Sequence, residues 1–175
     1  MERDLQPRLV EVPPAAGGRP DDPAYARAMA AAGRLLAARP RTEYELRSRL
    51  EAIAAPPRVV DRVLARVAEL GLVDDRAFAR QWVEERSRRL GPAVLVSELQ
   101  AKGVDRDVAE EAVAAAGLDE EAQARDLAAR LVAKVAGRPL REQRFRLQTM
   151  LSRRGISEEA AAAGVRAVLP PEGWD

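Results

Sequence analysis

The strongest constraint on the fold is a helical motif that occurs three times, at intervals of about 50 residues. In each copy two leucines lie four residues apart, and a small residue follows four residues after the second leucine. The copies are Leu46-x3-Leu50-x3-Ala54, Leu95-x3-Leu99-x3-Gly103 and Leu147-x3-Leu151-x3-Gly155. This spacing places both leucines on one face of a helix. A unit of this size cannot bury its apolar faces alone, so the period predicts tandem helical units that stack into an elongated, curved body.

Helix start and stop signals divide the chain between and around these copies. Capping residues or prolines mark the starts, and glycines or prolines mark most of the ends. The start signals are Asp22-Pro23, Thr42, Pro56-Pro57, Asp74-Asp75, Gly91-Pro92, Asp105, Asp119, Pro139 and Ser157. No alternation typical of strands occurs, so the sequence predicts an all-α chain of nine helices, arranged as three tandem three-helix, helix-turn-helix-like repeats. The expected division is a disordered tail over 1–22, repeats over 23–72, 73–117 and 118–169, and a short tail over 170–175.

The residue types present exclude most catalytic chemistry. The chain contains no cysteine and no histidine, which excludes disulfides, zinc sites built from those residues, thiol nucleophiles and histidine acid–base catalysis. The sequence has no G-x-x-x-x-G-K-[ST] phosphate loop. We interpret Asp74-Asp75 as a helix cap, since the further oxygen ligands that a metal site needs are lacking. We therefore expect a protein that is not an enzyme, with no catalytic residue, no metal and no cofactor.

Hydropathy gives an expectation about location. No window of 18 apolar residues occurs, and the N-terminus lacks the charged-then-apolar pattern of a signal peptide. The sequence therefore favours a cytoplasmic protein that does not contact membranes, and we expect a monomer.

Charge is unevenly distributed, although the formal net charge is only +1. Residues 138–154 contain six arginines and one glutamate, a net charge of +5. Residues 105–126 contain eight acidic residues and two arginines, a net charge of −6. Opposite blocks of this kind favour oriented docking on another charged macromolecule.

The middle of the chain resembles a known family. The segments Leu72-Val73-Asp74-Asp75-Arg76-Ala77-Phe78-Ala79 and Glu98-Leu99-Gln100-Ala101-Lys102-Gly103-Val104 are similar to the central signature of the RecX family. The segments Arg39-Pro40-Arg41-Thr42 and Arg153-Arg154-Gly155-Ile156 resemble parts of that family's first and third repeats. The likeness extends over about residues 24–169. One departure is Ile53-Ala54, which stands where a Lys-Gly-like ending is expected.

The resemblance implies a small bacterial regulator built of three three-helix repeats. Members of the family bind the RecA recombinase and its filament on single-stranded DNA, and they usually inhibit its recombinase, ATPase and coprotease activities. Weak direct binding to single- or double-stranded DNA is a further expectation. We expect the basic residues of the second helices and their flanks to contact the partner. They are Arg47, Arg49, Arg86, Arg88, Arg89, Lys102, Arg144, Arg153 and Arg154.

Two other classes of function stay open from the residues alone. Short three-helix units with basic helices also resemble helix-turn-helix modules that act directly on nucleic acid. A helical-repeat adaptor for another protein is the third class.

The aromatic residues allow two interpretations. Phe145 lies beside arginines on the helical wheel, where a nucleic-acid base could stack on it, but we favour packing against a neighbouring repeat. Phe78 and Trp82 are expected to pack in the core of the second repeat.

Overall fold

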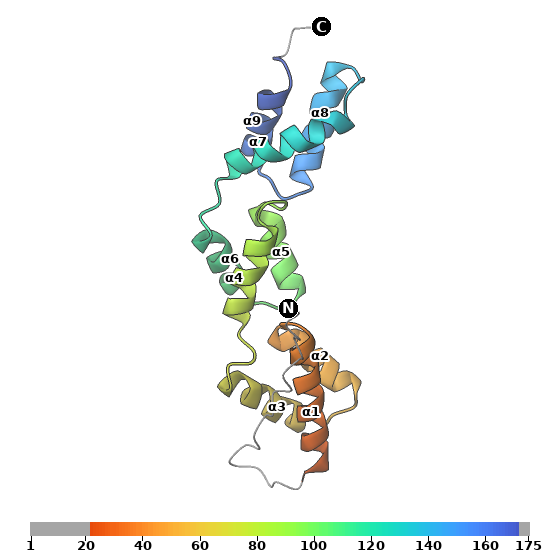
Figure 1. Ribbon diagram of the computed structural model, residues 1–175, viewed down its shortest axis with the longest axis vertical. Helices are drawn as coiled ribbons and strands as arrows, with labels where there is room; N and C mark the ends of the chain where they lie inside the picture. The colour runs from red at the N-terminus through yellow and green to blue at the C-terminus, as the bar shows by residue number, and fades with distance from the viewer. Residues whose placement is uncertain (1–21, 172–175) are drawn as a thin grey trace, which may run out of the picture. The chain divides into compact units, whose positions relative to one another are not determined.

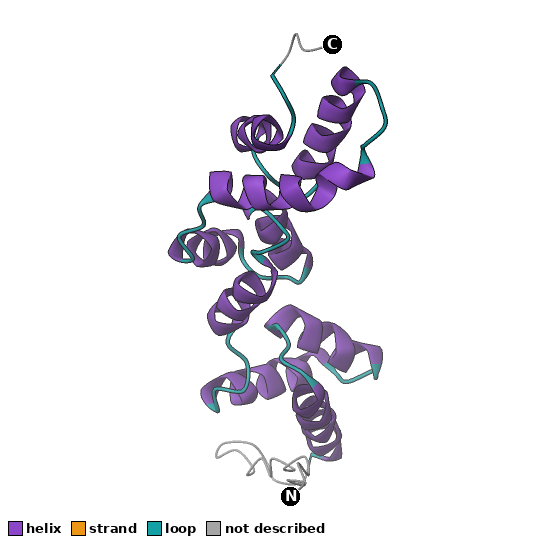
Figure 2. Ribbon diagram, turned by 45° about the horizontal axis from the view of Figure 1, so that its top comes forward, coloured by secondary structure: helices purple, strands orange, loops and turns teal. Residues whose placement is uncertain are grey.

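The computed structural model describes residues 22–171 of the chain (Figure 1). Within that range it contains nine α-helices, one 3-10 turn and no strand (Figure 2). The all-α prediction is therefore confirmed for the described residues. The elements are α1 (Pro23–Ala38), α2 (Glu43–Ala52), α3 (Pro57–Glu69), α4 (Asp75–Arg86), α5 (Pro92–Ala101), α6 (Arg106–Ala115), α7 (Glu120–Leu131), η1 (Val132–Lys134), α8 (Leu140–Ser152) and α9 (Glu158–Val168).

Several helices begin at the capping residues that the sequence indicates. Thr42 accepts a hydrogen bond from the Glu45 backbone N–H at 3.1 Å, and Asp119 caps α7 in the same way through Ala122 at 2.9 Å. These side chains satisfy backbone donors that have no partner inside the helix. Asp22, Asp105 and Ser157 cap α1, α6 and α9.

The two adjacent aspartates at the start of α4 have different tasks. Asp74 caps α4, since its Oδ1 accepts from the Ala77 N–H at 2.9 Å. Asp75 instead accepts from the backbone N–H of Glu43, the first residue of α2, at 3.0 Å. Burial raises the pKa of the Asp75 carboxyl above its ordinary value, and that hydrogen bond only partly opposes the effect. Asp74 therefore caps α4 as predicted, whereas Asp75 caps the start of α2, which the sequence does not predict.

The seventh helix is shorter than the sequence suggests. Leu127, Leu131 and Val135 fall on one side of a helix and predict a single helix as far as Gly137. In the structure, α7 ends at Leu131 and a 3-10 turn follows. Val135 lies after that turn and is still fully buried. Helix α8 has 13 residues, whereas α2 and α5, which carry the first two motif copies, have 10 each. When the three copies are aligned on their motif leucines, α8 begins about one turn earlier than α2 and α5 do.

The chain forms two compact units. The described part of the first unit comprises residues 22–78 and 102–104, and that of the second comprises 79–101 and 105–171. All six motif leucines are fully buried. Leu46 and Leu50 lie in the core of the first unit, whereas Leu147 and Leu151 lie in a core of the second. The two units divide the predicted second repeat, 73–117, so the repeat boundaries stay a prediction, as do the elongation and curvature of the array.

Two expectations concern the ends of the chain and membranes. The predicted tail over 1–22 lies outside the described residues except for Asp22, and so does the final tail beyond Pro171. No helix among residues 22–171 has the length and apolar character needed to cross a membrane.

Candidate interaction surfaces

In the first unit, the turn that ends the second motif copy docks on the start of helix α2. Thr42 is completely buried there, and its Oγ1 donates a hydrogen bond to the Lys102 carbonyl at 2.6 Å. Gly103 has a φ of +81°, and a Cβ added to it would overlap the Cβ of Tyr44. A glycine is therefore required both for its backbone conformation and for the close approach.

An ion pair fastens the same turn. The Lys102 Nζ lies 3.1 Å from Glu45 Oε1, and Arg39 Nη1 lies 2.8 Å from Oε2 of the same carboxylate. Burial raises the pKa of Glu45, but the hydrogen bonds from Arg39 and Lys102 outweigh it and hold that pKa below its ordinary value. Lys102 Nζ also lies 6.0 Å from the centroid of the Phe78 ring. The structure thus places Lys102, one of the predicted partner contacts, in the contact between this turn and the start of α2.

In the second unit, the turn that ends the third motif copy docks on the start of helix α5. The Gly91 N–H donates to the Arg154 carbonyl at 2.6 Å. Gly155 has a φ of +83°, and a Cβ added to it would lie 2.6 Å from the backbone nitrogen of Val94. The two turns, Lys102-Gly103-Val104 and Arg154-Gly155-Ile156, therefore play equivalent parts in the two units.

The first motif copy ends differently, which accounts for its departure from the Lys-Gly pattern. Ala54 takes the same left-handed conformation, with a φ of +56°, and is exposed. Ile53 before it is 55% exposed. An exposed turn leaves room for a Cβ, so an alanine is tolerated at the position where Gly103 and Gly155 are required.

Three more predicted arginines hold the structure together. Arg47 Nη1 lies 2.7 Å from Asp61 Oδ1 and thereby links α2 to α3. Arg154 Nη1 donates to the Met150 carbonyl at 2.7 Å. The third, Arg86, belongs to a cluster of its own.

Arg86 packs between α4 and α5 in the second unit. Its guanidinium carbon lies 3.3 Å from the centroid of the Trp82 ring, and its Nε lies 3.7 Å from Glu98 Oε2. The Trp82 Nε1–H donates to the same oxygen of Glu98 at 2.9 Å. Phe78 is buried as expected, whereas Trp82 is only partly buried because its indole edge reaches this cluster. A guanidinium stacked and paired in this way serves mainly to hold the two helices together.

Arg88 and Arg89 lie in the turn between α4 and α5. Both are exposed, and neither side chain has an ion pair or hydrogen bond within residues 22–171. Side chains of α7 hold the backbone of this turn. The Gln123 Nε2 donates to the carbonyls of Ser87 and of Leu90, the latter at 2.8 Å, and Arg130 Nη2 donates to the Arg88 carbonyl at 3.1 Å. A turn fixed at three carbonyls presents two unpaired guanidinium groups, and such forked donors suit carboxylates and phosphates.

A third basic surface lies along helix α8. Phe145 is 72% exposed, so the interpretation that it packs against a neighbouring repeat is wrong. Arg153 is exposed and lines two shallow hollows next to the Phe145 ring. Arg144, on the same helix, is partly buried, and its Nε and Nη2 have no hydrogen-bond acceptor among the described residues. The last of the predicted arginines, Arg49, is exposed on α2 in the first unit.

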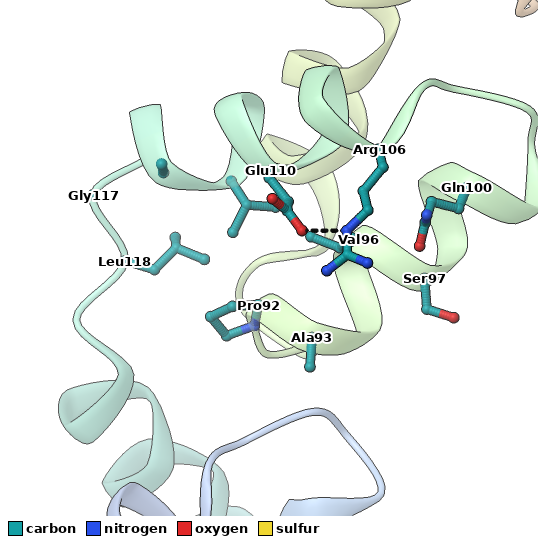
Figure 3. Close-up of a pocket in the computed structure, with 11 residues that line it drawn as sticks. Pro92, Ala93, Val96, Ser97, Gln100, Arg106, Glu110, Gly117 and Leu118 are labelled. Atoms are coloured by element: carbon teal, nitrogen blue, oxygen red, sulfur yellow. Dashed lines mark hydrogen bonds and ion pairs between the residues drawn. The ribbon is translucent and has the colours of Figure 1, made fainter.

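An apolar groove between α5 and α6 is a feature that the sequence reasoning missed (Figure 3). Its volume is about 690 Å³, and Pro92, Val96 and Leu118 contribute to its lining. Figure 3 shows the ion pair between Arg106 and Glu110 beside Val96, with an Nε to Oε1 distance of 2.7 Å. The lining is mostly apolar, so the groove offers apolar contact. Across residues 22–171 no cluster of three metal-ligating side chains occurs.

Two family models match the chain. One is described as "RecX, first three-helix domain" and matches residues 28–66, and the other as "RecX, second three-helix domain" and matches residues 74–113. The chain therefore carries these domains in tandem, as the motif period predicts.

Proteins similar to this chain include two bacterial relatives of comparable length. The regulatory protein RecX of Thermobifida fusca (strain YX) is 41% identical over 164 residues, which cover 92% of this chain and 88% of the relative. That of Mycobacterium ulcerans (strain Agy99) is 42% identical over 170 residues, covering 93% and 95%. The crystal structure of RecX from Lactobacillus salivarius matches with a TM-score of 0.73 at 20% identity, covering 82% of this chain and 95% of that chain. At such low identity this last likeness concerns the fold alone.

Proposed function

This chain belongs to the RecX family, and from that premise we propose that it binds the RecA recombinase and its filament on single-stranded DNA and inhibits the recombinase, ATPase and coprotease activities. The relatives are named as regulatory proteins, and the chain's residue types suit binding better than catalysis. Inhibition would follow from occupying filament surface that must rearrange during ATP turnover.

The observation that carries this proposal is the fixed turn that exposes Arg88 and Arg89. Long side chains lose rotamer freedom when they bind, and a backbone that is already fixed adds no further ordering cost. Gln123 and Arg130 supply that fixation from α7. Two guanidinium groups in neighbouring positions can meet two carboxylates or phosphates on a polyanionic filament.

The predicted contacts divide into two groups under this proposal. Arg49, Arg88, Arg89 and Arg153 are exposed and have no ion pair within the described range, so we assign them to the partner. Arg47, Arg86, Lys102 and Arg154 make contacts inside the protein, and we assign them to positioning. Arg144 belongs to neither group, since two of its nitrogens are buried without a hydrogen-bond partner in the described part of the chain.

The test is ATP hydrolysis by the cognate RecA on single-stranded DNA, titrated with the full-length protein below one molecule per RecA protomer. We expect hydrolysis to fall with dose. The variant R88E/R89E should need at least about tenfold more protein for the same inhibition, because two attractive contacts become repulsive. The matched control is R80E/R125E, which makes the same charge change on exposed positions of α4 and α7 and should inhibit like the wild type.

Two results would contradict the proposal, and a third would contradict its contact surface. If the wild type leaves hydrolysis unchanged and binds duplex DNA with a log–log salt slope steeper than about −4, direct action on nucleic acid is the better assignment. If neither RecA nor DNA responds, the protein is an adaptor for another partner. If R88E/R89E inhibits as well as R80E/R125E, RecA modulation stands but the turn is not its contact surface.

A further inference from the structure

The exposed ring of Phe145 occupies the motif position that supports docking in the first unit. Counting back two residues from the first motif leucine gives Tyr44, Ala93 and Phe145 in the three copies. Tyr44 lies against Gly103 of the docked turn, and in the second copy the neighbouring Val94 lies against Gly155. Phe145 on α8 is instead 72% exposed, the largest exposed fraction of any large apolar side chain among the described residues.

Helix α8 is not built to receive a turn of the same kind. In the first two copies, Thr42 and Gly91 donate to the carbonyls of the docked turns. The equivalent position in the third copy is Gln143. Because α8 begins about one turn earlier, the Gln143 N–H is consumed inside the helix by the Pro139 carbonyl at 3.0 Å. Its side-chain Nε2 donates to the Arg138 carbonyl at 2.6 Å. The donor that fixes the other two turns is therefore absent, so a turn of that kind cannot dock around Phe145 in the same way.

The charge around Phe145 is strongly positive. Four exposed arginines occur on this helix or next to it, namely Arg138, Arg141, Arg146 and Arg153. The acidic residue among them, Glu142, lies 2.7 Å from Arg146 Nε and 3.0 Å from Arg138 Nη1. Arg141 and Arg153 have no ion pair in the described part of the chain, so they can meet external anions.

The surface beside the ring is hollowed. One hollow of about 510 Å³ is lined by Phe145, Gln148, Thr149, Ser152 and Arg153. A second, of about 490 Å³, is lined by Phe145, Thr149 and Arg153 together with Glu142, Arg146 and Met150. Both are shallow and share the Phe145 ring. Space beside an open aromatic ring suits a flat occupant that stacks, and the amide and hydroxyl groups in the lining can hydrogen-bond to its edges.

From this combination we propose that the Phe145 face of α8 is a binding site for single-stranded nucleic acid. A base stacks on the Phe145 ring, and the phosphates of neighbouring nucleotides pair with Arg141 and Arg153. An acidic peptide could use the arginines, but it has no flat π-face to match the open ring. The site acts on bare nucleic acid and so does not depend on the RecA proposal.

The test measures fluorescence anisotropy of a labelled oligothymidylate of about 20 nucleotides with the full-length protein. We expect F145A to weaken binding by about five- to 150-fold, the loss typical of one stacked base. F145W should bind at least as tightly as the wild type, whereas F145L, which is apolar but has no ring, should behave like F145A. The control I53A removes another exposed apolar side chain and should leave the affinity unchanged.

A second measurement addresses the phosphates. The variant R141Q/R153Q should make the log–log salt slope for the oligothymidylate shallower by about 1.4, because two phosphate contacts are lost on a single strand. Duplex DNA of the same length should bind less tightly, since its bases are already stacked. The melting temperature of each variant should match the wild type, because the altered side chains are exposed.

Two results would overturn the site, and a third would separate it from the inhibitory contact. If F145L binds like the wild type, the ring contributes apolar area and not stacking. If F145A leaves oligothymidylate binding intact but weakens binding of a poly-glutamate peptide, the occupant is an acidic protein segment. If F145A loses the oligonucleotide and still inhibits RecA like the wild type, the nucleic-acid site and the inhibitory contact are separate. In that case both proposals stand.

Discussion

The two docked turns have the same backbone geometry but are held by different chemistry. In the first unit, side chains do the work, through the Thr42 hydroxyl and the pair between Lys102 and Glu45. In the second unit, the Gly91 backbone N–H holds the turn by donating to the Arg154 carbonyl. A Cβ at Gly91 would overlap the Gly155 carbonyl, so two glycines meet there. The comparison teaches that the repeated feature is the left-handed turn itself, whereas it can be held by titratable side chains or by a backbone hydrogen bond between closely packed glycines.

The largest expected effect comes from adding a Cβ at Gly155, in the joint between the docked turn and α5 of the second unit. We call the corresponding contact between the docked turn and α2 of the first unit the polar joint. Gly155→Ala should lower the free energy of unfolding by about 3 kcal/mol, measured by urea denaturation. A left-handed alanine costs about 1–2 kcal/mol, and the added Cβ must also displace the start of α5. Gly117→Ala is the matched control, since Gly117 has a φ of +56° with no atom within 4 Å of its added Cβ. It should lose only the conformational part, and equal losses in the two variants would show that the Gly155 joint is not tightly packed.

Removing one hydroxyl tests the polar joint at a smaller cost. Thr42→Val keeps the shape of the side chain but leaves the Lys102 carbonyl and the Glu45 N–H without their partner. We expect the free energy of unfolding to fall by about 1–3 kcal/mol, because both groups would be unsatisfied at a buried site. Thr42→Ser keeps the hydroxyl and should lose only the contribution of one methyl group, about 1 kcal/mol. A Thr42→Val protein as stable as Thr42→Ser would mean that packing, not hydrogen bonding, holds this turn.

The sequence predicts the helices of both units well, because their signals are local. Thr42 and Asp119 cap the helices that follow them directly, and the motif leucines are buried by their own periodicity. Features that depend on distant contacts were not predictable. Asp75 caps a helix 32 positions earlier in the chain, and nothing local distinguishes it from Asp74.

The candidate surfaces were less predictable than the helices for the same reason. A helical wheel gives the direction of Phe145 but not whether another element covers that direction, so its exposure was missed. Basic residues could be located from the sequence, but their partners could not. Arg86 packs inside the protein because Trp82 and Glu98 lie within its reach, whereas Arg88, two positions later in the turn, is exposed.

The smallest expected effect is a difference between the two joints in how acid pH changes the free energy of unfolding. The pKa of Glu45 is lowered in the folded protein, so its ion pair with Lys102 and Arg39 contributes stability above the unfolded pKa of about 4.3. That contribution is lost as the pH falls through the lower folded value. Asp75 contributes with the opposite sign, since burial raises its pKa, but it is present in wild type and variant alike. The comparison of wild type with E45Q therefore isolates Glu45.

We expect wild type to exceed E45Q in the free energy of unfolding by about 0.5–1 kcal/mol near neutral pH, because the pair is partly exposed. The difference should stay constant down to about pH 5 and then shrink as Glu45 becomes protonated. Lys102→Met should show the same window, whereas Gly155→Ala should lose an amount that does not depend on pH, because its joint contains no titrating contact. If the E45Q difference grew in acid, the carboxylate would be destabilising in the folded state, and the polar joint would rest on Thr42 alone.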